Sequence, residues 1–198
     1  MLNRKFRFPG IAPLSLAAAV LGGCMTATPY QPYITEAAPG VHGGYSEQQL
    51  APDLFLVRFH GNELASRERV EAYLLYRGAE LTLQRGFDWF HPVTSHTEHE
   101  IRTYTTPDPF YEPYYGHPYW RPYWRYYNRG YGWNYWDPWI GGPFWYNHVD
   151  VRTVEAFEAS AQISMHKGPI LASEPRAMDA RTVMAQIGPT IELPKTRR

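Results

Sequence analysis

Residues 54–90, LFLVRFHGNELASRERVEAYLLYRGAELTLQRGFDWF, decide the fold. In their first six positions every second side chain is Phe or Val, which is the alternation of a half-buried strand. Apolar residues then recur at helical spacing between Ser66, a favourable N-cap, and Gly86, which can end a helix in the left-handed conformation. The stretch therefore predicts a strand, a long helix and a second strand at residues 87–91.

Segments outside this stretch extend the same pattern. Residues 44–50 predict a strand, and residues 51–53 a turn that leads into the next one. From Phe157 to Met165 apolar and polar residues alternate, as in an antiparallel sheet with one buried face. A short helix is expected from Asp179 to Gly188, and a less regular strand at residues 98–105. We therefore predict an α+β fold, in which a small, mostly antiparallel sheet has one long and one short helix packed on one face.

Four short motifs lie in the first part of this domain: GYSE at 44–47, VRFHGN at 57–62, YLLYRGAELT at 73–82 and GFDWF at 86–90. Together they resemble the pattern of an uncharacterised family of small lipoproteins from Gram-negative bacteria. The departures are Gly78, where the family has alanine, and Phe87, where it has tyrosine. The resemblance covers residues 43–90 well and residues 150–190 loosely. It implies a location in the cell envelope and implies no activity.

The first 24 residues have the features of a secretory signal that ends in a lipidation site. Three basic residues lie within the first seven, and an apolar run at residues 11–21 is too short to span a bilayer. Leu21-Gly22-Gly23-Cys24 resembles the bacterial lipobox, with Gly22 where alanine or serine is commoner. The resemblance implies cleavage after Gly23 and a diacylglyceryl group on the Cys24 thiol. The alternative is an ordinary secretory signal with an incidental cysteine.

On the lipoprotein hypothesis, acyl chains on Cys24 hold the mature protein on a membrane. Met25, and not aspartate, follows the cysteine, which by resemblance to enterobacterial sorting favours the outer membrane and a domain facing the periplasm. Cleavage removes three of the 19 basic residues and none of the 19 acidic ones, leaving a formal charge of −3 that argues against a nucleic-acid partner. Residues 24–42 are predicted to form a flexible tether.

An unusual tract interrupts the predicted domain. Of the 37 residues from 110 to 146, 18 are Phe, Tyr or Trp, interleaved with proline and glycine. We interpret residues 107–148 as an insertion between two parts of the α+β domain, 43–106 and 149–190, with a tail at 191–198. Three hypotheses remain open: a mobile loop without a defined ligand, a contact with the membrane or an envelope protein, and a saccharide platform. The residues expected to make contact are Trp120, Trp124, Trp133, Trp136 and Trp139.

Signs of catalysis are weak. Lipidation would consume the single cysteine, and the chain has no G-x-S-x-G motif around a serine. His91, His96 and His99, with two glutamates beside them, suggest a metal-dependent envelope enzyme as the alternative to a polar surface turn. Arg77 and Glu80 are expected to form a surface ion pair. Asp88 is expected to bond to backbone. The favoured hypothesis is a lipid-anchored binding or structural module without cofactor or catalysis, whose partner beyond the membrane is an envelope protein or glycan.

Overall fold

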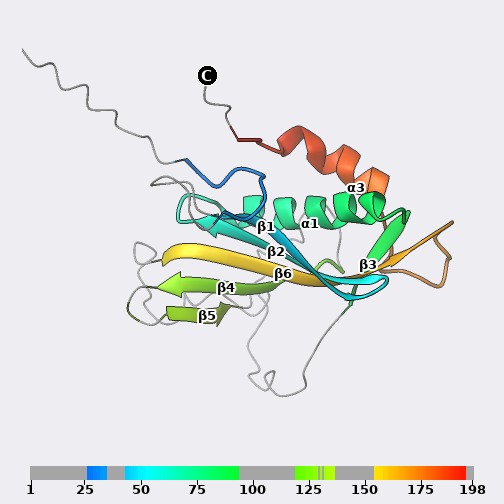
Figure 1. Cartoon of the computed structure of the whole chain (residues 1–198), viewed down its shortest axis with the longest axis horizontal. Helices are drawn as coiled ribbons and strands as arrows, with labels where there is room; N and C mark the ends of the chain where they lie inside the picture. The colour runs from blue at the N-terminus through cyan, green and yellow to red at the C-terminus, as the bar shows by residue number, and fades with distance from the viewer. Residues whose placement is uncertain are drawn as a thin grey trace, which may run out of the picture.

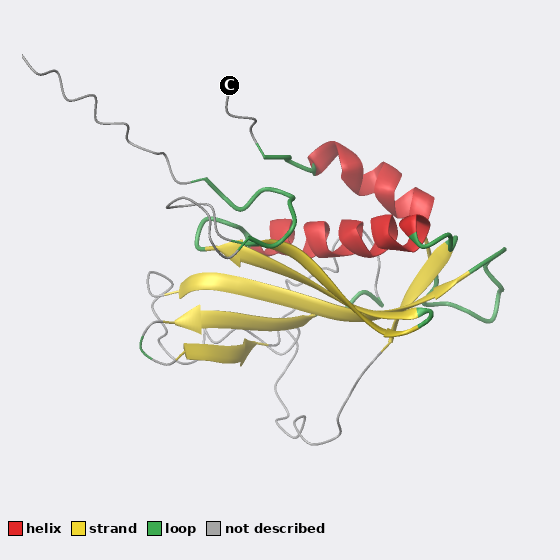
Figure 2. Cartoon of the chain, in the orientation of Figure 1, coloured by secondary structure: helices red, strands yellow, loops and turns green. Residues whose placement is uncertain are grey.

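A computed structural model describes residues 26–34, 43–93, 119–128, 130, 132–136 and 154–194. These residues form one antiparallel sheet of seven strands with two α-helices on one of its faces, which confirms the predicted α+β fold (Figures 1 and 2). None of the described helices is long and apolar enough to cross a bilayer. In chain order the elements are β1 (Gly44–Ala51), β2 (Leu54–Asn62), α1 (Arg67–Gln84), β3 (Trp89–Val93), β4 (Tyr123–Asn128), β5 (Gly132–Trp136), β6 (Val154–His166), β7 (Met178–Asp179), α3 (Ala180–Ile187) and the 3-10 helix η3 (Gly188–Thr190).

Strand β6 is the centre of the sheet. Nine of its thirteen residues, 156–164, pair with β2 along one edge, and β2 pairs in turn with β1. Its other edge is shared by two strands, because β3 pairs with residues 162–166 and β4 with residues 154–160. β3 and β4 therefore follow one another along the same edge, and each carries a further strand, β7 and β5 respectively.

The core lies between the sheet and α1. Phe55, Val57 and Phe59 of β2 and alternate residues of β6 point to this side, as their alternation predicted. Helix α1 begins after Ser66, whose hydroxyl accepts a hydrogen bond from the backbone N–H of Arg69, and ends before Gly86 with φ of 76°. Helix α3 packs against α1 and begins after Asp179, which accepts from the Thr182 N–H. Both predicted helices are thus confirmed.

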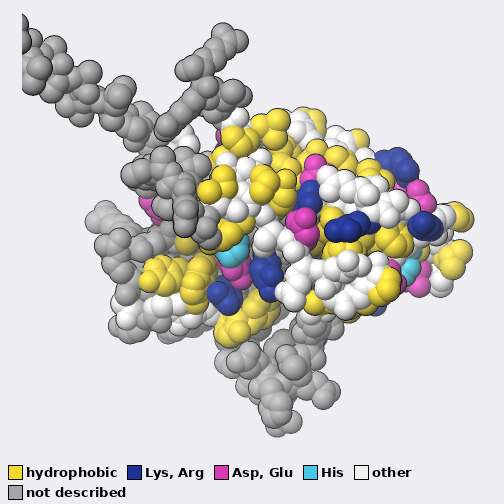
Figure 3. All heavy atoms as spheres, in the orientation of Figure 1, with side chains coloured by type: hydrophobic (Ala, Val, Ile, Leu, Met, Phe, Trp, Pro, Cys, Tyr) yellow, Lys and Arg dark blue, Asp and Glu magenta, His cyan; other side chains and the backbone are white. Residues whose placement is uncertain are grey.

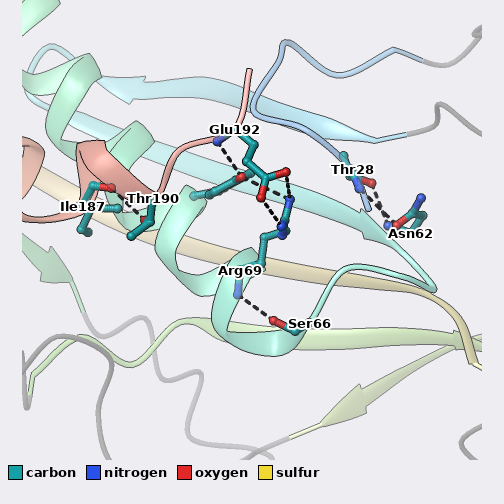
Figure 4. Close-up of polar contacts among 8 residues, drawn as sticks. Thr28, Asn62, Ser66, Arg69, Ile187, Thr190 and Glu192 are labelled. Carbon is teal, nitrogen blue, oxygen red and sulfur yellow. Dashed lines mark hydrogen bonds and ion pairs between the residues drawn. The ribbon is translucent and has the colours of Figure 1, made fainter. Parts of the chain in front are cut away.

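The prediction of a flexible tether is wrong for residues 26–34. This segment lies against the domain, and the side chains of Thr28, Tyr30 and Gln31 are buried. Two hydrogen bonds join Thr28 and Asn62 reciprocally: Thr28 N–H to the Asn62 amide oxygen at 3.2 Å, and Asn62 N–H to the Thr28 hydroxyl at 2.9 Å (Figure 4). The Asn62 amide also donates to the Thr26 carbonyl at 2.7 Å. The rest of the expected tether, residues 35–42, lies outside the described part of the chain.

Where the structure describes the predicted insertion, its residues belong to the sheet. Residues 123–128 and 132–136 are strands β4 and β5, which pair with each other, and Gly132 at the start of β5 has φ of 74°. Trp124 lies opposite Ala159 on β6 and points into the core, where Trp120 contacts Phe90 edge to face at 6.3 Å. Part of the tract is therefore structural. The predicted strand at 98–105 lies outside the described residues.

Arg77 was expected on the surface but is buried beneath strand β1. Its guanidinium bonds to Glu47 at 3.0 Å and to Glu80, and it lies 4.3 Å from the centre of the Tyr45 ring. The Tyr30 hydroxyl donates to the same Glu80 carboxylate at 2.5 Å. Burial opposes the charge on Arg77, but the bonds to Glu47 and Glu80 outweigh it and raise its pKa. A buried guanidinium needs carboxylate partners, and Arg77 finds them on two elements. The cluster of Arg77, Glu47, Glu80 and Tyr30 therefore joins helix α1, edge strand β1 and the N-terminal segment.

Two glycines provide a matched test of this packing. A Cβ atom on Gly61 of β2 would lie 2.7 Å from a methyl group of Val70 and 2.8 Å from Ala65, so Gly61→Ala must push α1 away from the sheet. We expect a loss of about 1–3 kcal/mol in the free energy of unfolding.

Gly78→Ala is the control, because its Cβ would meet Phe90 and Ile163 at ordinary distances of 3.5 and 3.6 Å. Since alanine favours a helix, this change should stabilise the protein by about 0.5–1 kcal/mol. Urea denaturation of the two variants measures both effects. Equal effects of the two substitutions would contradict the packing of α1 on β2.

Candidate contact surface on the outer face of the sheet

The face of the sheet away from α1, here called the outer face, carries the candidate site. Trp124 and Tyr126 of β4 point to the side of the sheet that α1 covers. Because side chains alternate along a strand, those of Tyr123, Arg125 and Tyr127 point to the outer face. The same alternation in β5 places two aromatic side chains on the outer face, opposite those of β4. We call the five residues of this surface the aromatic platform: Tyr123, Arg125, Tyr127, Trp133 and Tyr135.

The platform is exposed and its rings contact one another. Relative exposure is 48% for Tyr123, 41% for Trp133 and 59% for Tyr135. Tyr123 and Tyr135 meet edge to face at 4.9 Å, and Tyr127 and Trp133 lie 5.5 Å apart. The Arg125 guanidinium lies over the Trp133 ring at 4.7 Å, within the range of a cation–π contact. Cross-strand pairs thus hold the rings in fixed positions on a flat surface.

Beside the platform lies a charged group that anchors Arg125. Glu158 of β6 is buried, and its carboxylate lies 3.1 Å from His60 Nδ1 and 3.6 Å from Arg125 Nε. The His60 ring also contacts Tyr33 at 4.4 Å and Trp133 at 6.5 Å. Figure 3 shows histidine, acidic and basic side chains meeting in this part of the surface, with hydrophobic side chains beside them.

The pKa of His60 is lowered by this environment. Burial is the main cause, Arg58 and Arg125 add to it, and only Glu158 opposes it. His60 is therefore held toward its neutral form, and the charged partner of Glu158 is Arg125, whose guanidinium lies over the Trp133 ring. The arrangement suits binding: ring faces for apolar surfaces and a positioned guanidinium for hydrogen-bond acceptors.

A second group on the outer face contains His91, the one described member of the predicted histidine cluster. Its ring lies 5.0 Å from His166, and its Nδ1 is 3.7 Å from the Glu174 carboxylate. His166 stacks on Trp89 at 4.2 Å and lies 3.1 Å from the Ser164 hydroxyl. Across the described part of the chain, no three His, Cys, Asp or Glu side chains group as a metal site. His96 and His99 lie outside it, so the metal-enzyme alternative stays a prediction.

The five tryptophans expected to make contact divide into three groups. Trp120 and Trp124 are fully buried, so their assignment to the contact surface is corrected: they fill the core. Trp133 is exposed on the platform, and its contact with a ligand stays a prediction. Trp136 lies in β5 opposite Trp124, and Trp139 and the lipidation residue Cys24 lie outside the described residues.

Sequence reasoning missed four members of the platform and the buried Glu158. The signal that identifies strands, a period-two alternation of apolar and polar residues, is hidden because both faces of β4 carry aromatic rings. A usable sign was the Asn128–Gly132 turn between two aromatic runs, since glycine after a strand marks hairpins. Asp88 behaves as expected: it accepts the Gly168 N–H at 2.8 Å, and this bond, with Arg181, lowers its pKa.

Comparison of this chain with models of protein families, with curated proteins and with solved structures finds no significant match.

The Glu158→Gln substitution tests the charged group. Because Glu158 alone raises the pKa of His60, we expect that pKa to fall further below its ordinary value of 6.5. The unfolded chain then binds the proton more tightly than the folded chain. The free energy of unfolding should therefore decrease as the pH drops below about 6.5, and more steeply in the variant.

An NMR titration of the His60 ring protons measures this pKa. His91 serves as the internal control, because its carboxylate neighbour is Glu174 and its pKa should not change. A His60 pKa that rises or stays constant in the variant would show that Glu158 does not act on this ring.

Proposed function

We propose that this chain is an exported, lipid-anchored protein of the cell envelope that acts by binding through the aromatic platform and not by catalysis. The observation that carries the proposal is the platform itself: three rings, each more than 40% exposed, fixed on two paired strands. The lipid anchor at Cys24 comes from the sequence. The ligand class that the platform suits is an envelope glycan or protein with an apolar face.

Exposed rings on rigid strands are better suited to binding a ligand than rings on a mobile loop. A Tyr or Trp side chain has few rotatable bonds, so little conformational entropy is lost when it contacts a ligand. Pairing of Tyr123 with Tyr135 and of Arg125 with Trp133 reduces that cost further, because the contacts exist before the ligand arrives. The hypothesis of a mobile loop lacks this preorganisation and does not fit strands β4 and β5.

Polar groups beside the rings can fix the orientation of a bound ligand on the platform. The Arg125 guanidinium lies over the Trp133 ring and 3.6 Å from the Glu158 carboxylate, and its planar set of N–H groups can donate hydrogen bonds to a ligand beside Trp133. A glycan offers both an apolar ring face and hydroxyl acceptors, which makes the saccharide hypothesis chemically consistent with this arrangement. A protein segment with aliphatic and carboxylate side chains uses the same two features.

The anchor is tested by Cys24→Ser. We expect this variant to remain an uncleaved precursor without incorporation of a palmitate analogue, because the thiol is the acceptor of the lipid. The natural chain should incorporate the label and float with membranes in a density gradient. Recovery of the natural chain without fatty acid, at the full mass of 23.0 kDa, would contradict the proposal.

The platform is tested by a Tyr123→Ala/Tyr135→Ala double variant. Solubilised envelopes and purified envelope glycan are each passed over the immobilised protein. We expect the double variant to bind at least about tenfold more weakly, since about 1.4 kcal/mol of lost ring contact corresponds to that factor. Binding to glycan alone or to a protein alone identifies the class of ligand.

The matched control is Leu50→Ala/Leu171→Ala, which removes two exposed apolar side chains outside the platform. This control should bind like the natural chain. Equal retention by the two double variants would show that the platform is not the contact surface.

A further inference from the structure

The stretch of chain between the proposed lipid anchor and the folded domain is very short. Only Met25 separates Cys24 from Thr26, whose carbonyl accepts the Asn62 side-chain N–H at 2.7 Å. A polypeptide spans at most about 3.6 Å per residue, so the Cys24 and Thr26 backbones lie within about 7 Å of each other in any conformation. Lipid on Cys24 would therefore hold the end of strand β2 directly at the bilayer surface.

The N-terminal segment is fixed too firmly to act as a tether. Beyond the Thr28–Asn62 pair, Tyr30 N–H donates to the Glu192 carbonyl at 2.8 Å, and Tyr33 N–H to the Tyr45 carbonyl at 2.7 Å (Figure 4 shows the Thr28–Asn62 pair and Glu192). A Cβ atom on Gly44 would lie 2.3 Å from the Gln31 carbonyl oxygen, so the segment packs closely on β1. Because this segment is held firmly against the domain, a lipid anchor attached to it restricts the position of the whole domain relative to the membrane.

Exposed apolar side chains gather at the same end of the sheet. Asn62 pairs with Ala156, Ala156 with Tyr127, and Tyr127 with Trp133, so these four residues form one row across four strands. At about 4.8 Å per strand, Trp133 is roughly 14 Å from Asn62. Exposed Tyr33 contacts His60, which contacts Trp133 in turn. Leu64, 50% exposed, follows Asn62 by two residues.

We infer that Tyr33, Leu64 and Trp133, here called the anchor end, lie in the headgroup region of the membrane that holds Cys24. The inference rests on the proposed lipid anchor. Tyrosine and tryptophan are stable at the boundary between water and hydrocarbon, where a ring is apolar and its polar atom stays wet. Because the acyl chains already hold the domain at the surface, weak contacts from three side chains are enough to set its orientation.

Charge does not direct this contact. Exposed Glu63 precedes Leu64 of the anchor end. The nearby arginines have carboxylate partners: Arg67 with Glu68, Arg69 with Glu192, and Arg125, which lies over Trp133, with Glu158. An anionic surface therefore gains little from this end. Neutral phospholipid should therefore be enough for this contact, whereas a polybasic surface requires anionic lipid.

The orientation has a consequence for the platform. Strands β4 and β5 extend away from the row that contains Tyr127 and Trp133. At about 3.3 Å per residue, Tyr135 lies roughly 7 Å and Tyr123 roughly 13 Å from that row along the strands, on the side away from the anchor end. In this orientation Trp133 contacts the headgroups, whereas Tyr123 and Tyr135 stand above them and remain open to a ligand.

A fluorescent label at selected sites tests the orientation on the acylated, full chain in neutral phosphatidylcholine–phosphatidylethanolamine vesicles. In the mature lipoprotein Cys24 carries the lipid, so an introduced cysteine is the single free thiol. The test positions are Tyr33→Cys and Leu64→Cys at the anchor end. The controls are Leu50→Cys and Leu171→Cys, which are similarly exposed and lie near the β1–β2 turn and after β6, at the opposite end of the sheet (Figure 1).

We expect phospholipid with a spin label on its headgroup to quench the two test positions at least about twofold more than the two controls. Equal quenching at all four positions, with the protein still floating with vesicles, overturns the orientation and leaves the lipid anchor intact. Loss of flotation overturns the anchor and the orientation together. All four sites are on the surface, so the label does not disturb the core.

Discussion

The structure depends on a single strand that requires partners on both edges. β6 has thirteen residues, and a buried strand of that length leaves no backbone N–H or C=O group free to face apolar surroundings. β2 pairs with nine of these residues along one edge, but β3 is only five residues long and covers less than half of the other. β4 supplies the remaining partners. This requirement brings a segment with no apolar–polar alternation into the sheet and divides its aromatic residues between two faces.

That division decides which rings are structural and which can bind. Trp120 and Trp124 belong to the core: Trp124 lies opposite Ala159 of β6, and Trp120 contacts Phe90 of β3. Tyr123, Trp133 and Tyr135 remain exposed because the outer face lies away from α1. A platform built this way is rigid for the same reason that the core is stable: each exposed ring is attached to a strand whose opposite side is packed or paired.

Local signals in the sequence were reliable where they act over short distances. The N-cap Ser66, the terminating Gly86 and the strict alternation from Phe157 to Met165 each fix a conformation within a few residues. Signals failed where the outcome depends on distant partners. Arg77 pairs with Glu80 on its own helix, but its burial follows from Glu47 and Tyr45 on β1. Thr28 and Asn62, 34 residues apart, hold the N-terminal segment that composition alone marks as a tether.

The sequence by itself determined strands β1, β2 and β6, both α-helices with their ends, and the buried face of β6, because periodicity and capping are properties of adjacent residues. It also predicted the lipid anchor at Cys24. Only the tertiary structure decided which tryptophans enter the core and which residues form the platform, because both faces of β4 carry rings and only pairing with β6 tells them apart. The tertiary structure likewise decided that the N-terminal segment packs beside Asn62. Its partners are the end of β2, the start of β1 and the chain near Glu192, which are far apart in the sequence and meet only in the folded protein.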